Sequence, residues 1–104
     1  MAIVLNSGYF LPTAKYGNAQ NVSIGASSVQ STVIGTAGQT PNRLIRLCAT
    51  TNCRIAIGTN PTASATSTLL PANAIEYCEL TPGERFAVIQ DSAAGTLSIT
   101  ECVL

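Results

Sequence analysis

Short runs in which apolar and polar residues alternate dominate the chain from residue 42 onward. Such alternation places every second side chain on the same face, as in a β-strand with one buried face. No segment repeats apolar residues with a 3.6-residue period over ten positions, so we expect little helix. The predicted strands span residues 44–49, 53–58, 74–80, 85–91 and 96–103, and a further alternating stretch covers 27–34.

The segments between these strands predict how the strands connect. Residues 50–52 separate the strands at 44–49 and 53–58, so we expect those two strands to form a hairpin. Residues 60–68 are small and hydroxylated, which is typical of a surface loop. The sequence Thr-Pro-Gly-Glu at 81–84 has the proline and glycine that a type II turn requires.

The spacing of the strands predicts an all-β fold. Roughly six to eight strands in a chain of this length are typical of an antiparallel β-sandwich, jelly-roll or immunoglobulin-like. The beginning of the chain differs, because its apolar runs are short and Gly8, Pro12 and Gly17 interrupt them. We therefore expect an extended N-terminal arm over residues 1–26 and a β-sandwich domain over residues 27–104.

The charge balance narrows the choice of partners. Five Lys and Arg residues oppose five Asp and Glu residues, and charged residues make up 10% of the chain. Nucleic acids and anionic membranes bind clustered positive charge, so we expect neither as a partner. A surface with so little electrostatic repulsion suits a protein that packs into an assembly. A weakly charged monomer kept soluble by its hydroxyl groups is the alternative.

The residue types also argue against an enzyme. The chain has no histidine, which excludes Ser-His-Asp triads, Cys-His dyads and histidine-ligated metals. The carboxylates are scattered, and the glycines match no phosphate-binding loop. We therefore expect no catalytic residue, no metal site and no cofactor.

The cysteines indicate a reducing compartment. Cys48, Cys53, Cys78 and Cys102 form no Cys-x-x-Cys pair and have no histidine to complete a zinc site, so we expect reduced, buried thiols. A bridge between Cys48 and Cys53 is the main alternative. The first residues show no secretory signal and no stretch long enough to span a membrane, which predicts synthesis in a cytoplasm.

Five residues are candidates for contacts with a partner. Tyr9, Phe10 and Tyr16 lie in the predicted arm, where aromatic side chains can anchor to another subunit or dock back onto the sandwich. Arg46 and Arg54 lie on neighbouring strands of the predicted hairpin. Arginine is favoured at protein interfaces because its planar guanidinium group makes several directed hydrogen bonds. Isolated salt bridges are the alternative for both arginines.

The order of several short sequences from residue 46 to residue 101 resembles small virion proteins of tailed bacteriophages, the class that includes capsid decoration or cement proteins. This stretch covers just over half of the chain. The sequences are Cys-Ala-Thr-Thr (48–51), Cys-Arg-Ile-Ala-Ile-Gly-Thr-Asn-Pro-Thr-Ala (53–63), Leu-Leu-Pro-Ala-Asn (69–73), Leu-Thr-Pro-Gly-Glu (80–84), Ala-Val-Ile-Gln-Asp (87–91) and Gly-Thr-Leu-Ser-Ile-Thr-Glu (95–101). The resemblance implies a β-sandwich, often a homotrimer or homodimer, that binds the outside of an icosahedral capsid and locks capsomers together. It carries over no catalytic residue.

We therefore expect a structural protein of the virion, made in the host cytoplasm and located on the capsid surface. Its expected partners are the major capsid protein and further copies of itself, and the arm is expected to reach onto the shell. The alternative is a receptor-binding or glycan-binding module of a head fibre, neck or tail. That function favours exposed aromatic residues on a sheet, and Tyr77 is the candidate within a predicted strand.

Overall fold

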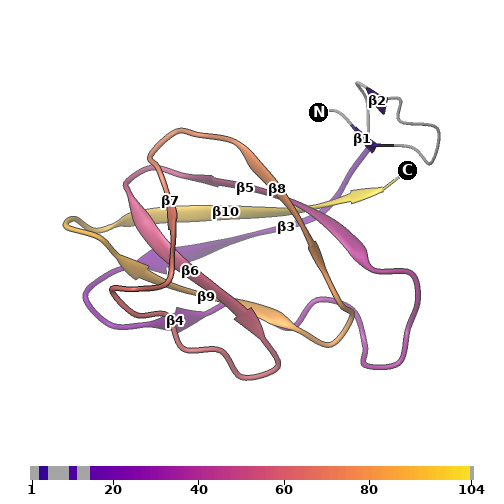
Figure 1. The fold of residues 1–104 in the computed structure, drawn as a ribbon, viewed down its shortest axis with the longest axis horizontal. Helices are drawn as coiled ribbons and strands as arrows, with labels where there is room; N and C mark the ends of the chain where they lie inside the picture. Colours follow the sequence, from indigo (N-terminus) through magenta and orange to yellow (C-terminus); the bar gives the residue numbers. More distant parts are fainter. Residues whose placement is uncertain (1–2, 5–9, 12–14, 104) are drawn as a thin grey trace.

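The computed structural model describes residues 3–4, 10–11 and 15–103, and it confirms the predicted antiparallel β-sandwich (Figure 1). Two four-stranded antiparallel sheets pack face to face. The first sheet has the strand order β3 (Lys15–Ile24), β10 (Gly95–Val103), β5 (Arg43–Ala49) and β8 (Glu76–Leu80). The second sheet has the order β4 (Val29–Gln30), β9 (Arg85–Gln90), β6 (Cys53–Gly58) and β7 (Thr68–Leu70). Two short strands, β1 (Ile3–Val4) and β2 (Phe10–Leu11), pair only with each other.

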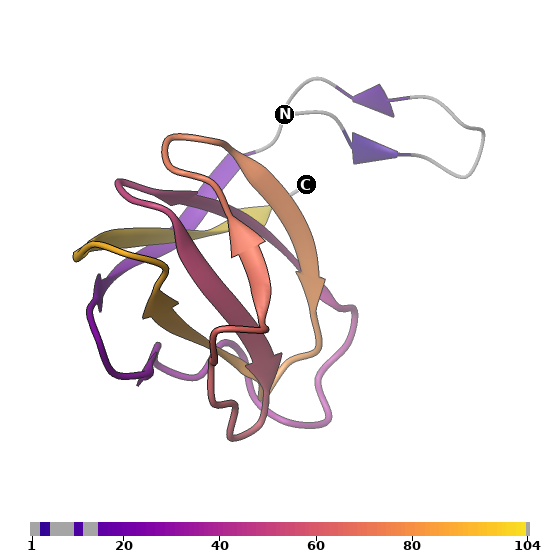
Figure 2. The same ribbon diagram turned by 60° about the vertical axis from the view of Figure 1, so that its left-hand side comes forward.

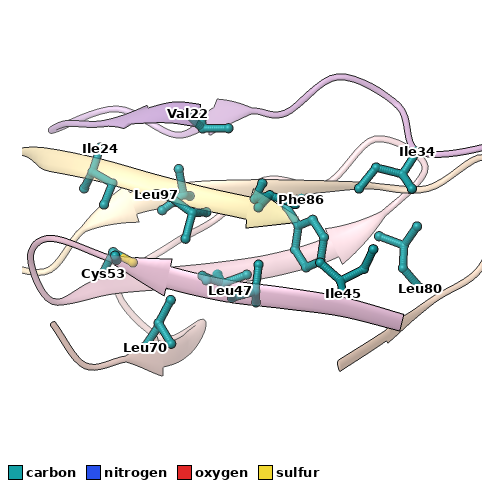
Figure 3. Close-up of a cluster of buried hydrophobic side chains, with 14 residues drawn as sticks. Val22, Ile24, Ile34, Ile45, Leu47, Cys53, Leu70, Leu80, Phe86 and Leu97 are labelled. Carbon is teal, nitrogen blue, oxygen red and sulfur yellow. The ribbon is translucent and has the colours of Figure 1, made fainter. Parts of the chain in front are cut away.

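The core lies between the two sheets, where the apolar side chains of alternating positions meet (Figure 3). In β5 every second residue is buried, and β10 beside it in the same sheet adds further buried side chains. β9 of the second sheet contributes buried side chains that face them across the core. Burial of each large apolar side chain contributes about 1.5–3 kcal/mol, so this layer supplies most of the folding free energy. The labelled members of the cluster are Val22, Ile24, Ile34, Ile45, Leu47, Cys53, Leu70, Leu80, Phe86 and Leu97.

The prediction of an arm over residues 1–26 is wrong for residues 15–24, because these form β3. This strand pairs with β10 along most of its length, from Ile24 opposite Gly95 to Lys15 opposite Val103. As an edge strand it buries few side chains, chiefly Val22 and Ile24, so its apolar pattern is short. Residues 25–26 of the predicted arm lead from β3 toward β4, and of residues 1–14 the structure describes β1 and β2 alone.

The predicted hairpin of residues 44–49 and 53–58 is also wrong. β5 belongs to the first sheet and β6 to the second, so residues 50–52 carry the chain from one layer to the other. The Thr50 N–H donates to the carbonyl of Thr96 at 3.0 Å, which ties this crossing to the neighbouring, oppositely directed crossing between β9 and β10. Alternation shows which face of a strand is buried but not which layer holds the strand, and this explains the error.

The alternating stretch at 27–34 forms only the short strand β4 and an isolated bridge between Ile34 and Glu84. Ser31 is buried although it is polar, because its backbone N–H donates to the Phe86 carbonyl at 2.8 Å and its hydroxyl accepts the Phe86 N–H at 3.0 Å. The predicted turn at 81–84 is confirmed. Glu84 N–H donates to the Thr81 carbonyl at 3.0 Å, and Gly83 has a φ of 99°, in the region that favours glycine.

Shortening the chain tests the placement of β3. A chain that begins at residue 15 should retain a cooperative thermal transition, because every strand of the two sheets remains. A chain that begins at residue 25 loses the partner of β10 and the burial of Val22 and Ile24, which costs about 3–6 kcal/mol. That loss is comparable to the total stability of a small domain. Circular dichroism during heating measures the melting temperatures of the two shortened chains. Equal melting temperatures would contradict the placement of β3 in the first sheet.

Candidate functional site

The outer face of the first sheet brings together three residues with the chemistry of a binding surface. Ile45 and Leu47 are buried, so Arg46 between them lies on the outer face of β5. Tyr77 of β8 is directly opposite Arg46 and therefore lies on the same face. Tyr16 of β3 reaches this face from the other side of β10, and Arg46 Cζ lies 5.8 Å from the centroid of its ring. We call Tyr16, Arg46 and Tyr77 the Arg46 face.

The contact between Arg46 and Tyr16 passes over β10 and shields two of its side chains. Thr100 lies opposite Arg46, and Cys102 lies opposite Tyr16. Both are buried although they belong to the outer side of the sheet. Burial raises the pKa of the Cys102 thiol, while the nearby Arg46 charge acts in the opposite direction. The Arg46 guanidinium group lies over the Tyr16 ring at cation–π distance, a contact that contributes about 0.5–1 kcal/mol at an exposed site.

Arg46 forms no ion pair within the described residues, although the exposed Glu79 lies on the same face of β8 as Tyr77. The ion pairs found among residues 15–103 join Arg43 to Glu101 at 2.9 Å and Arg54 to Asp91 at 3.2 Å, and Arg46 belongs to neither. The Tyr16 side chain is 70% exposed, so the stacked pair meets solvent directly. An arginine stacked on a tyrosine, with its charge not neutralised in the described part of the chain, can donate hydrogen bonds to a carboxylate or carbonyl group of a partner.

Arg54 lies elsewhere, so the structure does not bring the two predicted arginines together. It is on β6 in the second sheet, where its Nε and Nη2 atoms lie 3.3 and 3.2 Å from Asp91 Oδ1. Its Nη1 atom donates to the Ser67 carbonyl at 3.4 Å. Arg54 therefore forms an isolated salt bridge, which was the alternative for both arginines. It was grouped with Arg46 because the strands that carry the two residues were wrongly expected to form a hairpin.

The loop at 59–67 packs on the outer side of the second sheet. Gln30 Nε2 donates to the Asn60 side-chain oxygen at 2.9 Å and to the Pro61 carbonyl at 2.8 Å. The backbone N–H of Ala63 donates to Ser28 Oγ at 2.9 Å. Beneath this loop Ala87 is fully buried although its neighbours Phe86 and Val88 face the core. The loop at 59–67 thus covers part of the outer face of the second sheet, whereas Tyr16 on the first sheet stays exposed.

Two of the predicted aromatic anchors cannot be placed. Tyr9 lies outside the described residues, and of Phe10 only the backbone is described, in β2. Tyr77, which sequence reasoning treated as a glycan candidate, is the residue that joins Arg46. Its position depends on the pairing of β5 with β8, and no local signal in the sequence shows that pairing.

The four cysteines are free thiols, so no bridge joins Cys48 and Cys53. Cys53 and Cys102 are buried as predicted, whereas Cys48 and Cys78 are only half-buried. Burial raises the pKa of Cys53 from 9.0 to about 11. Burial, with a smaller contribution from the Glu76 charge, raises the pKa of Cys78 to about 11 as well. These thiols stay protonated, and therefore poorly nucleophilic, at neutral pH.

The raised pKa of Cys53 predicts a loss of stability in alkali. Between about pH 9 and pH 11 the unfolded chain loses this proton while the folded chain keeps it, so the free energy of unfolding falls as the pH rises. In urea unfolding at pH 8 and pH 10.5, Cys53→Ala should reduce that fall. Ile55→Val removes one buried methylene without removing a titratable group, and it should lower stability about equally at both pH values. If the free energy of unfolding of Cys53→Ala fell as much between pH 8 and pH 10.5 as that of the unchanged protein, ionisation of Cys53 would not be the cause of the fall.

Within the described ranges, no group of three or more Cys, Asp or Glu side chains is arranged to hold a metal ion. No helix in that part of the chain is long and apolar enough to cross a membrane. Comparisons of the chain with protein-family models, with curated proteins and with solved structures found no match.

Proposed function

We propose that this protein is a structural component of the virion of a tailed phage, a decoration protein that binds the outer shell of the capsid and stabilises the junctions between capsomers. The observation that carries the proposal is the Arg46 face. The resemblance of residues 46–101 to small virion proteins supports the choice of a capsid as the partner.

The Arg46 face has the composition of an interface centre. Tyrosine and arginine are the residues most often found at positions that dominate binding, because they combine a large apolar contact area with directed hydrogen bonds. Here the contact of Arg46 with the Tyr16 ring restricts both side chains before binding, which reduces the conformational entropy that binding removes. The three side chains lie on one face of the same sheet, so they can meet a partner together.

Binding stabilises the shell through mass action. A protein that binds only the assembled shell lowers the free energy of that state, by about 2.7 kcal/mol per site when its concentration is 100 times its dissociation constant. A net charge of zero keeps electrostatic repulsion low between copies that crowd on one surface. Many weak contacts of this kind oppose rupture of the shell by the packed DNA.

Glycan binding is the second candidate function, and the exposed ring of Tyr16 is the observation that favours it. Sugar rings stack on exposed aromatic side chains, and Tyr77 and Arg46 would supply hydrogen-bonding groups beside such a ring. This function requires a receptor-binding position in a fibre, neck or tail. It predicts saturable binding of oligosaccharides without any change in the stability of the shell.

Replacing Arg46 tests the proposed function. Capsids that lack the protein should resist heating better once the purified protein is added. Arg46→Ala should weaken this binding at least about tenfold, because it removes the charge and the stacked contact at the centre of the face. Sedimentation of capsids with bound protein measures the affinity, and the temperature of shell rupture measures the stabilisation.

Arg54→Ala is the matched control. It removes an arginine from the other sheet, and it should leave capsid binding within about twofold of the original value. Equal losses for the two variants would mean that the Arg46 face is not the contact surface. Binding to cell-surface glycans with no effect on shell rupture would replace the proposal by the second candidate.

A further inference from the structure

The sandwich is closed along one edge and open along the other. On the side of β3 and β4, the Thr32 backbone N–H and hydroxyl both donate to Gln20 Oε1, at 2.9 and 3.1 Å, and link the two layers. On the opposite side, between β7 and β8, lies a groove of about 490 Å³. Figure 2 turns these two strands toward the reader.

The groove is mainly apolar. Leu47, Ile55 and Leu70 line it and also belong to the core between the sheets. Ile57 and Leu69 line it too but stay exposed, Ile57 to 43%. Covering such a surface with another apolar group lowers the free energy, because it removes apolar area from water.

Among the described residues, both strands beside the groove have an unpaired edge. Within residues 15–103, β7 pairs with β6 alone and β8 with β5 alone, so each strand has one side without a strand partner there. Such edges are templates for the addition of an extended segment, in which backbone hydrogen bonds give affinity and pockets take alternate side chains. The groove therefore fits an extended apolar segment better than it fits a compact ligand.

The chain itself contains such a segment. β1 and β2 pair Ile3 with Leu11 and Val4 with Phe10, and they belong to neither sheet of the sandwich. A two-stranded sheet by itself is at best marginally stable in water. Residues 1–14 also contain no charged side chain, so no charge opposes their burial. These apolar residues need a surface to cover them.

The groove of the same chain is poorly placed for this segment. β3, which follows the segment directly, and β8 are the opposite edges of the first sheet. Three strand spacings separate them, about 14 Å, and the segment would have to cross the sheet to reach its own groove. The segment can reach the equivalent groove of a neighbouring copy without crossing its own sheet.

We propose that the groove between β7 and β8 binds residues 3–11 of a second copy of this chain, so that copies associate by donating these segments to one another. Tyr77 lines this groove as well as belonging to the Arg46 face, so the two surfaces adjoin each other. The proposal concerns contacts between copies in the absence of any shell, so its test does not depend on capsid binding.

A charge placed in the groove tests the proposal. In analytical ultracentrifugation the intact protein should form an oligomer, and Ile57→Asp should raise its dissociation constant about tenfold or more. Val33→Asp is the matched control, because Val33 is 47% exposed but does not line the groove, and it should leave association unchanged. A monomer at all concentrations, or an oligomer equally sensitive to both variants, would overturn the proposal.

Cross-linking identifies the occupant independently of stability. One copy carries an affinity tag and Phe10→Cys, and the other carries Leu69→Cys, at an exposed position that lines the groove. Both copies also carry Cys78→Ser, so that the native thiol in the groove does not compete. A short bismaleimide should join the two copies, and the product should disappear when the second copy retains Leu69. A single chain with both thiols that cross-links only within itself would show that the segment occupies its own groove, and would overturn the exchange between copies.

Discussion

The burial of apolar side chains between the two sheets is the constraint on which the other features depend. Phe86, Ile45 and Leu97 are fully buried, because β9, which carries Phe86, lies in the layer opposite to β5 and β10, which carry Ile45 and Leu97. That packing leaves two outer faces and two edges. The loop at 59–67 covers part of one face, and hydrogen bonds of Gln20 close one edge. The Arg46 face and the groove between β7 and β8 are the surfaces that stay open.

Alternation of apolar and polar residues was enough to find the central strands, because each of them buries one complete face. β5, β6, β9 and the turn at 81–84 were predicted close to their observed bounds. Alternation could not assign strands to layers, since a strand facing its neighbour across the core has the same pattern as a strand paired beside it. It also missed β3, whose polar residues face solvent while its backbone pairs with β10.

The candidate site was only partly predictable for the same reason. Arg46 was identified from its residue type, but its neighbours depend on pairings between distant segments. Tyr77 joins it through the pairing of β5 with β8, and Tyr16 through the pairing of β3 with β10.

The neutral composition has a clearer meaning once these surfaces are known. A net charge of zero means that little electrostatic repulsion opposes contact at the Arg46 face or between copies at the adjoining groove.

The central claim is that the protein meets a capsid through the Arg46 face. An electron cryomicroscopy reconstruction of the virus particle at a resolution that shows side chains tests it most directly. The account predicts sandwich density on the outside of the shell, with Tyr16, Arg46 and Tyr77 against the major capsid protein. Sandwich density located only in a fibre, neck or tail, or on the shell with this face toward solvent, would contradict it.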